Sequence, residues 1–373
     1  MRSQLVEGRP RWASTGPARL WRDVLQRRLA TQRLSGDGLT LAADVVRLLA
    51  CVQSQEYAHG LWSLGMRTLG LGASAVQAEF DRGDILRTHI LRPTWHFVAA
   101  RDIRWILKVT SPRVQMLNQT IYRQEELDPA TLERGVALIV EELEGGRFLT
   151  RSELGNALAA RGLVSKRLRL AYIVMNAELE GIICSGPMRG AQQTYALLDE
   201  RAPQSLAARG DIVELAHRFF LGHGPASIRD LGRWSSLTIG QSRDAVAAVK
   251  EHLDRITVEG VELWFDPDAP QPRPPSGALL LPLYDEVTLS YPVINFPSAH
   301  GHPHQPGEDL FVGCVIIAEM NVGLWRRSIK GRKMIMEITL APGVTPGSRP
   351  LAEAAAAELA SFAGKELELT ITG

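Results

Sequence analysis

The feature that most constrains the fold of this chain is one pattern of elements that occurs three times before a Pro-rich segment. In its first occurrence, apolar residues fall at helical spacing over Leu41–Val52, and a capping box at Ser74-x-x-Gln77 opens a later helix. The chain then alternates as a strand over Ile85–Ile90 and returns through Trp95–Val98 after a tight turn. Helices followed by a hairpin are the elements of a winged helix, so we predict such a unit, with an N-terminal arm, over residues 1–122.

The same order of elements returns twice. The predicted helix starts carry capping residues, which stand at Asp128-Pro129, Thr150-x-x-Glu153, Ser165, Asp211, Ser227 and Thr238-x-x-Gln241. Short apolar runs at 182–185 and 194–198 predict one hairpin, and a turn at Glu259-Gly260 predicts the other. We therefore predict a second winged helix at 123–205 and a third at 206–266.

A tail of different character follows a Pro-rich linker at 267–277. Short apolar or alternating runs in the tail predict strands, at Leu279–Leu283, Leu310–Ala318, Gly323–Arg327, Lys333–Leu340 and Leu367–Ile371. An Ala-rich segment, Leu351–Ala363, predicts one helix. The fold class predicted is α+β, with three tandem winged-helix units followed by a small C-terminal β-barrel or sheet domain with a helix at 278–373.

Length and composition set the class of protein. A chain of 373 residues with 45 % hydrophobic residues is too long for one ordinary core, and it has no apolar run of about eighteen residues that would cross a membrane. The first residues lack a secretory signal, so we expect a cytoplasmic protein. Cys51, Cys184 and Cys314 are odd in number and widely spaced, which favours neither a disulfide framework nor a zinc site. We predict that His300-x-His302-x-His304 lies in a solvated Gly/Pro-rich loop and binds no metal.

Charge is unevenly distributed along a chain whose total charge is close to zero. Residues 1–35 contain eight Arg against two acids, residues 87–123 contain seven basic residues against one acid, and residues 322–336 contain five with no acid. Such stripes can hold a polyanion along one face, since phosphate contacts depend on local charge. The other interpretation, left open here, is that each stripe is an ordinary solvated helix face.

Familiar catalytic motifs are absent from the sequence, and two glutamines are the candidate catalytic residues. There is no Gly-x-Ser-x-Gly elbow, phosphate loop, dinucleotide fingerprint or His-Glu-x-x-His. Gln53 and Gln55 stand at the end of the apolar run of the first unit. Residues two apart on a helix point about 200° away from each other, so a shared site requires that the helix end near Gln53. The alternative is that both side chains bind loose carbonyls or water at a helix end.

Five motifs, taken together and in this order, resemble the AlkZ-like winged-helix DNA glycosylases. They are Gln53-Ser54-Gln55-Glu56-Tyr57, His59-Gly60-Leu61-Trp62-Ser63-Leu64, Arg87-Thr88-His89-Ile90-Leu91-Arg92-Pro93-Thr94-Trp95-His96-Phe97-Val98, Leu281-Pro282-Leu283-Tyr284-Asp285-Glu286 and Trp325-Arg326-Arg327. The resemblance extends from about Leu20 to the end of the chain. In this family a Gln-x-Gln motif in the first winged helix is catalytic, and a crosslink-unhooking branch has Asp at the second position. The two glutamines here are similar to the azinomycin-resistance branch, whereas Ser54 departs from the usual apolar middle residue.

The resemblance implies a monofunctional DNA glycosylase that hydrolyses the N-glycosidic bond of N7- or N3-alkylated purines, including bulky adducts or interstrand crosslinks from a genotoxic natural product. Alkylation puts a positive charge on the base, so the leaving group departs neutral and needs no general acid. Gln53 and Gln55 would orient a water and stabilise an oxocarbenium-like sugar. No cofactor is implied. No Lys lies near the pair to form a Schiff base, so we expect no strand cleavage.

The candidate DNA-binding residues lie in the first hairpin and in the tail. They are His89, Arg92, Trp95, His96, Arg326 and Arg327. A wing that presents Arg and an aromatic ring can lie along a groove, although Trp95 can instead pack in the core beside Phe97. The segment Tyr284-Asp285-Glu286 has three open interpretations, namely a hairpin, a domain contact or catalysis.

The expected partner is duplex DNA carrying alkylated purines, bound by a monomer that associates with the nucleoid when it is on DNA. The alternative function is a non-enzymatic winged-helix transcriptional regulator, because winged helices are common in such proteins and a fold does not fix a function. A regulator would favour a sequence-defined operator, often as a dimer, and the sequence shows no separate ligand or dimerisation domain.

Overall fold

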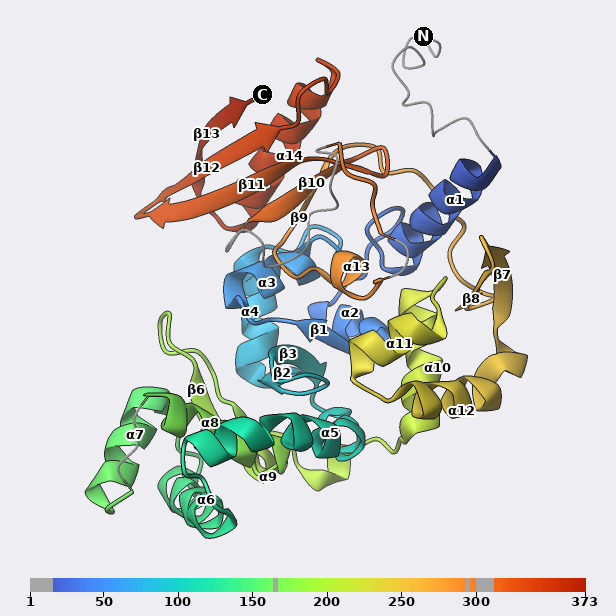
Figure 1. Cartoon of the computed structure of the whole chain (residues 1–373). Coiled ribbons are helices and arrows are strands. Elements are labelled where there is room, and N and C mark those ends of the chain that lie inside the picture. Colours follow the sequence, from blue (N-terminus) through green and yellow to red (C-terminus); the bar gives the residue numbers. More distant parts are fainter. Residues whose placement is uncertain (1–15, 164–166, 293–294, 300–311) are drawn as a thin grey trace.

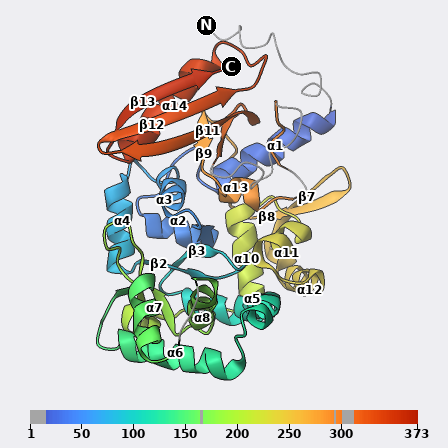
Figure 2. The same ribbon diagram turned by 60° about the vertical axis from the view of Figure 1, so that its left-hand side comes forward.

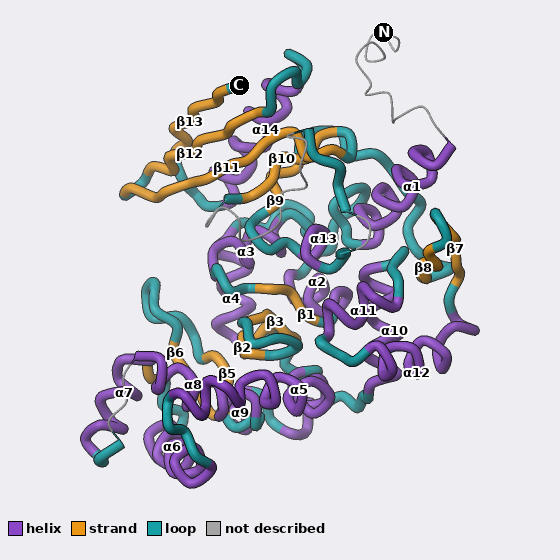
Figure 3. The backbone as a smooth tube through the Cα atoms, viewed as in Figure 1, coloured by secondary structure: helices purple, strands orange, loops and turns teal. Residues whose placement is uncertain are grey.

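The computed structural model describes residues 16–163, 167–292, 295–299 and 312–373 (Figure 1). Within these ranges the chain has a mixed α+β fold, as predicted, and its named strands form four sheets. The largest sheet lies at one end of the molecule, and groups of helices with smaller sheets make up the rest (Figures 1 and 2). Figure 3 shows the same division, since the C-terminal part is mostly strand and the remainder mostly helix.

The first group of elements surrounds a three-stranded antiparallel sheet with the order β1-β3-β2. Its elements, after an N-terminal helix α1 (Gly16–Thr31), are α2 (Ala42–Leu49), β1 (Cys51–Gln53), α3 (Tyr57–Gly65), α4 (Ala73–Arg82), β2 (Ile85–His89) and β3 (Trp95–Ala99). The apolar run predicted as one helix divides, because Ala50 takes a φ of 60° that a right-handed helix does not allow. The predicted capping box at Ser74 is wrong, since Gly72 is the N-cap of α4 and no side chain caps it.

The second group also contains a three-stranded sheet, with the order β4-β6-β5. Its elements are α5 (Ile103–Gln124), α6 (Pro129–Leu143), β4 (Leu149–Thr150), α7 (Arg151–Ala160), α8 (Arg167–Leu179), β5 (Ile183–Ser185), β6 (Thr194–Leu197) and α9 (Leu198–Arg201). The predicted cap at Asp128 and the predicted box at Thr150 are confirmed. Ser165, the third predicted cap, lies outside the described residues.

The third group combines helices with one two-stranded hairpin. Its elements are a 3₁₀ turn, η2 (Gln204–Leu206), then α10 (Ile212–His223), α11 (Ile228–Ser235), α12 (Ile239–Val249), a second 3₁₀ turn, η3 (Lys250–His252), β7 (Asp254–Val258) and β8 (Val261–Phe265). The structure confirms the predicted caps at Asp211, Ser227 and Thr238. The predicted turn at Glu259-Gly260 joins β7 to β8, and both of its residues have positive φ.

The C-terminal part is one five-stranded sheet with the order β13-β12-β11-β10-β9. Its elements are β9 (Leu279–Leu281), α13 (Glu286–Leu289), β10 (Gly313–Ile317), β11 (Met320–Lys330), β12 (Lys333–Leu340), α14 (Ser348–Phe362) and β13 (Glu366–Thr372). Because β13 and β9 occupy the two edges, the described strands form an open sheet, which is the second of the two predicted alternatives, barrel or sheet. α14 packs on this sheet through Ala352, Ala356 and Leu359, which share a core with Trp325.

A single hydrophobic core joins elements that are far apart in the sequence. It includes Leu29 of α1, Ile106 of α5, Phe219 of α10 and Val287 of α13. The segment between the third hairpin and β9 therefore does not separate the tail from the helices in space. In the described ranges, no helix has both the length and the apolar character to cross a bilayer.

Candidate active site

Gln53, Ser54 and Gln55 form a turn where β1 leaves its sheet. Gln53 pairs with His96 of β3, and the Ser54 N–H donates to the Trp95 carbonyl at 2.8 Å. The Gln55 N–H donates to Gln53 Oε1 at 2.9 Å, and the Trp95 N–H donates to Gln55 Oε1 at 3.2 Å. The Gln53 side chain thus contacts the backbone of Gln55 within one turn, whereas residues two apart on an α-helix point away from each other.

These bonds fix which way each amide faces. Because each carbonyl oxygen accepts a hydrogen bond from a backbone N–H, it retains one further lone pair that can accept a hydrogen bond from water. Neither amide nitrogen of Gln53 or Gln55 has a hydrogen-bond partner among the described residues. Gln53 is 8 % exposed and Gln55 is half-buried. The turn therefore presents two oriented amides whose remaining hydrogen-bonding capacity is free.

Arg87, on β2, clamps the same turn from inside. Its Nε and Nη2 donate to the Ser54 carbonyl at 3.0 and 2.7 Å, and Nη2 also donates to the Gln55 carbonyl at 3.1 Å. Its guanidinium carbon lies 4.2 Å from the centre of the Trp95 ring, and Nη1 contacts Gln193 of the second group. Burial lowers the pKa of Arg87 to about 10, which leaves it charged at neutral pH. Arg87 was not among the predicted site residues, although it stands in the motif quoted for the first hairpin.

Glu286, at the start of α13, is a second residue absent from the predicted site. Its Oε1 accepts the Gln53 N–H at 2.7 Å, and its Oε2 accepts Trp234 Nε1 at 3.2 Å. Burial alone would raise the pKa of Glu286, but the nearby imidazole of His223 and the charge of Arg92 outweigh it and bring the pKa to about 2. A buried carboxylate anion thus supports the backbone of Gln53.

The four predicted hairpin residues divide into two buried and two partly exposed side chains. His89 is buried, and its Nδ1 lies 2.5 Å from Glu178 on α8, which also accepts Trp95 Nε1 at 3.3 Å. His96 is fully buried, and its Nε2 lies 3.2 Å from Arg92 Nη2. Burial, and then the charge of Arg92, lower the pKa of His96 to about 3, so this imidazole is neutral. Arg92 and Trp95 keep part of their surface exposed.

Comparisons with known proteins bear on what such a site does. The family model of the AlkZ-like DNA glycosylases matches residues 46–362, which include the glutamine turn, Arg87 and Glu286. The chain belongs to the AlkZ-like DNA glycosylase family. This DNA glycosylase also has the fold of the solved Streptomyces sahachiroi DNA glycosylase AlkZ, with a TM-score of 0.76 at 20 % identity over 94 % of this chain and 99 % of that one. A search of the curated proteins gave no match.

Arg326 and Arg327, the predicted residues of the tail, lie next to each other on β11 of the glycosylase. Because neighbouring residues of a strand face opposite ways, they occupy opposite faces of the sheet. Arg326 is exposed and pairs with Glu337 at 2.5 Å. Arg327 is half-buried and shares its face with Trp325, whose ring stacks on His59 at 5.3 Å. Burial, and then the charge of Arg327, lower the pKa of His59 to about 4, so Arg327 lies close to the start of α3.

No group of three or more His, Cys, Asp or Glu side chains suited to a metal ion occurs in the described part of the chain. The predicted loop at His300, His302 and His304 lies outside that part. Cys51 and Cys184 are buried free thiols, and Cys314 is a free thiol of intermediate burial.

Gly60 of α3 explains why a small residue stands at the middle of the turn. A Cβ added at Gly60 would lie 2.8 Å from the Phe97 ring and 3.0 Å from Ser54 Cβ, both too close. Gly60→Ala should therefore push Ser54 and both glutamines outward, lowering the free energy of unfolding by about 1–3 kcal/mol. It should also slow base excision by about tenfold, measured in single turnover. Gly277→Ala is the control, because a Cβ there meets nothing within 4 Å; an unchanged excision rate in Gly60→Ala would contradict this account.

Proposed function

We propose that this DNA glycosylase hydrolyses the N-glycosidic bond of N7- or N3-alkylated purines, with Gln53 and Gln55 as its catalytic residues. The observation that supports this most is the orientation of the two amides, each oxygen of which is held by a backbone N–H and keeps a free lone pair. An alkylated purine is already cationic, so it leaves as a neutral base and needs no proton. The site then has only to place a water and stabilise the sugar.

The two amides fit these tasks by their chemistry. One carbonyl oxygen can accept a hydrogen bond from the attacking water and so orient it, with the proton released to solvent after attack, and the partial negative charge of both oxygens favours an oxocarbenium-like sugar in front of them. The charged Arg87 lies behind the turn and donates to backbone carbonyls, so it holds the turn in shape. No Lys stands in the turn to form a Schiff base, so the product is an abasic site in an intact strand.

The direct test uses a duplex with one N7-methylguanine. After incubation with the protein and treatment with alkali, we expect strand scission at that position only, and none without alkali. A transcriptional regulator would leave no alkali-sensitive site and would instead select an operator sequence. Free N7-methylguanine in the supernatant distinguishes hydrolysis of the glycosidic bond from strand cleavage.

We further propose bulky adducts and interstrand crosslinks as substrates, since both motif positions are Gln, as in the azinomycin-resistance branch that the sequence resembles, and azinomycin is itself a crosslinking agent. We propose that the three groups of helices and hairpins are winged helices with boundaries at 1–122, 123–205 and 206–266, followed by a linker at 267–277 and the tail at 278–373. The protein would act as a cytoplasmic monomer that joins the nucleoid on DNA.

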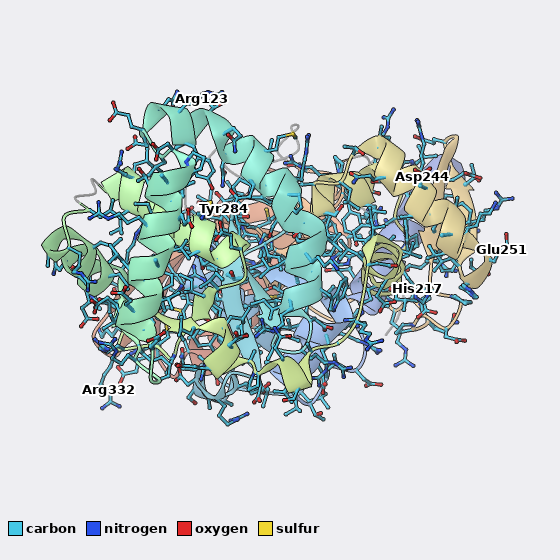
Figure 4. The ribbon with its side chains drawn as sticks, turned by 90° about the horizontal axis from the view of Figure 1, so that it is seen from below. Arg123, His217, Asp244, Glu251, Tyr284 and Arg332 are labelled. Carbon is cyan, nitrogen blue, oxygen red and sulfur yellow. The ribbon has the colours of Figure 1, made fainter. Side chains whose placement is uncertain are left out.

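For the DNA interface, we propose direct contact by Arg92 and Trp95, which are partly exposed beside the glutamine turn. His89 and His96 are buried, so their part in binding would be to hold these two side chains in place. Arg326 and Arg327 would contact phosphates. In the view from below, Arg332, in the turn that joins β11 to β12, lies at the edge of the molecule, and Tyr284 lies well inside the outline of the molecule (Figure 4).

Replacing Arg326 and Arg327 together by Ala should weaken binding to damaged and undamaged duplexes by the same factor. Phosphate contacts carry no sequence or lesion information, and each one lost lowers the slope of log affinity against log salt by about 1. Fluorescence anisotropy at several salt concentrations measures both quantities. Arg349→Ala, at an exposed arginine of α14 paired with Glu353, serves as the control. A loss of affinity confined to the damaged duplex would assign these arginines to lesion recognition instead.

The excision rate should be nearly independent of pH. Amides do not titrate. The nearby groups with shifted pKa values keep one protonation state through neutral pH, since the pKa of Glu286 is about 2, that of His96 about 3 and that of Arg87 about 10. We expect the single-turnover rate on N7-methylguanine to change less than about threefold between pH 6 and pH 8.5. A rate that falls steadily as the pH rises would reveal a general acid and contradict the proposed chemistry.

A further inference from the structure

We propose that Glu286 is a positioning residue of the glycosylase reaction and that it acts through Gln53. The inference rests on the proposed catalytic role of Gln53. Glu286 is fully buried, and its carboxylate lies 2.7 Å from the backbone nitrogen of Gln53, a residue 233 positions earlier in the chain. It therefore touches the support of a catalytic side chain and not the reacting atoms.

The carboxylate is itself held in place from outside the first group of elements. Trp234 Nε1 donates to Oε2 at 3.2 Å, and Ser290 Oγ lies 3.0 Å from the same oxygen. His223 Nε2 of α10 lies 3.6 Å from the same oxygen and helps to lower the pKa of Glu286. The other oxygen, Oε1, accepts the Gln53 N–H. By holding the carboxylate, the third group and α13 therefore together determine where the end of β1 lies.

The segment that carries Glu286 is preorganised on its N-terminal side. The Leu283 N–H donates to His59 Nδ1 at 3.0 Å, and Asp285 forms a buried ion pair with Arg67 at 2.7 Å. Between them, Tyr284 takes a φ of 67°, in a region that bulky residues avoid. Such strain persists only where the surroundings over-determine the backbone, which is the condition a positioning residue needs.

The position of Gln53 controls both amides of the turn. Gln53 ends a strand of three residues, and its Oε1 accepts the N–H of Gln55. A shift of the Gln53 backbone therefore moves both glutamines relative to the sugar. Misplacement of reacting groups by about 1 Å can cost on the order of 10²-fold in rate.

The test compares Glu286→Gln with wild type in single-turnover release of N7-methylguanine and in affinity for the same duplex. The new amide matches the size of the carboxylate, but its NH₂ must face one of the N–H donors, so one contact is lost. We expect the rate to fall by about tenfold or more and the dissociation constant to stay within about threefold. Adding Trp234→Phe removes the opposing donor and should restore part of the rate. An unchanged rate in Glu286→Gln would overturn the proposal.

Glu79→Gln is the matched control for loss of a buried carboxylate. Glu79 accepts the N–H groups of Ala42 and Ala43 at 3.0 and 2.8 Å, at the opposite end of α2 from the glutamine turn. It should lower the melting temperature while leaving the rate within about twofold. A rate loss in Glu79→Gln equal to that in Glu286→Gln, at equal loss of melting temperature, would reduce Glu286 to a structural residue and overturn the proposal.

Two further measurements separate this inference from the proposed function. Amide hydrogen exchange of a peptide covering 51–56 needs no activity, and exchange should speed up in Glu286→Gln relative to Glu79→Gln; equal exchange would contradict the positioning role even if wild type releases no base. Should Glu286→Gln not fold, Ser290→Ala removes one partner of the same carboxylate. We expect it to lower the rate by about two- to fivefold, and an unchanged rate would again overturn the proposal.

Discussion

Replacing Gln55 by Ala should abolish release of N7-methylguanine while leaving affinity for DNA within a few-fold of wild type. The Gln55 oxygen accepts the Trp95 N–H and keeps one free lone pair, so its removal takes away an oriented partner for water or the sugar cation. One preorganised electrostatic group contributes on the order of 10²-fold to a rate. Single-turnover kinetics, with abasic sites detected as strand scission after alkali treatment, measure the rate. Fluorescence anisotropy measures the affinity.

Two further variants sharpen that result. Gln55→Glu keeps an oxygen at the same distance but replaces the NH₂ donor with a second oxygen and adds a negative charge, so it should retain activity within about tenfold if the oxygen is what matters. Gln119→Ala, an exposed glutamine on α5, should leave the rate unchanged. Normal excision by Gln55→Ala would remove Gln55 from the catalytic site, and a large loss in Gln55→Glu would move its role from the oxygen to the nitrogen.

The sequence identified the glutamine pair but not the geometry that makes it usable. Apolar spacing over Leu41–Val52 predicts one helix, because a strand of three residues such as β1 is too short to show a period of two. The break depends on Ala50, which has a φ of 60°. An Ala residue gives no indication in the sequence of such a positive φ. Once β1 leaves the helix, the two glutamines meet at one turn, and the requirement that the helix end near Gln53 is satisfied.

Residues that support the site were harder to predict because their contacts cross the whole chain. Glu286 meets Gln53 over 233 positions, and Arg87 reaches the carbonyls of Ser54 and Gln55 from another strand. No local period encodes such contacts. Helix caps, by contrast, depend on three or four consecutive residues, and those at Thr150 and Thr238 were predicted correctly. The box at Ser74 failed because the preceding Gly72 allows the helix to begin earlier.

Breaking the ion pair between Arg67 and Asp285 should destabilise the protein more than any surface change. Both side chains are fully buried, and the guanidinium donates to both carboxylate oxygens, at 2.9 and 2.7 Å. Arg67→Met would leave Asp285 buried without its counter-charge, which costs about 3–5 kcal/mol. Urea unfolding followed by tryptophan fluorescence should show a large fall in midpoint, or no folded protein. Arg349→Met, at an exposed pair, should cost less than about 1 kcal/mol.

The double variant Arg67→Met/Asp285→Asn shows whether Arg67→Met loses stability because the hydrogen bonds of the ion pair are lost or because Asp285 is left as an unpaired buried charge. Asn keeps the side-chain oxygen that caps α13 by accepting the Val287 N–H at 3.0 Å. With no charge left unpaired, the double variant should recover most of the midpoint, because replacing a buried pair is often neutral where removing one partner is not. Recovery would mean that the pair fixes the segment before Glu286 and adds little net stability. A double variant as unstable as Arg67→Met would show that the paired hydrogen bonds themselves hold the C-terminal part against α3.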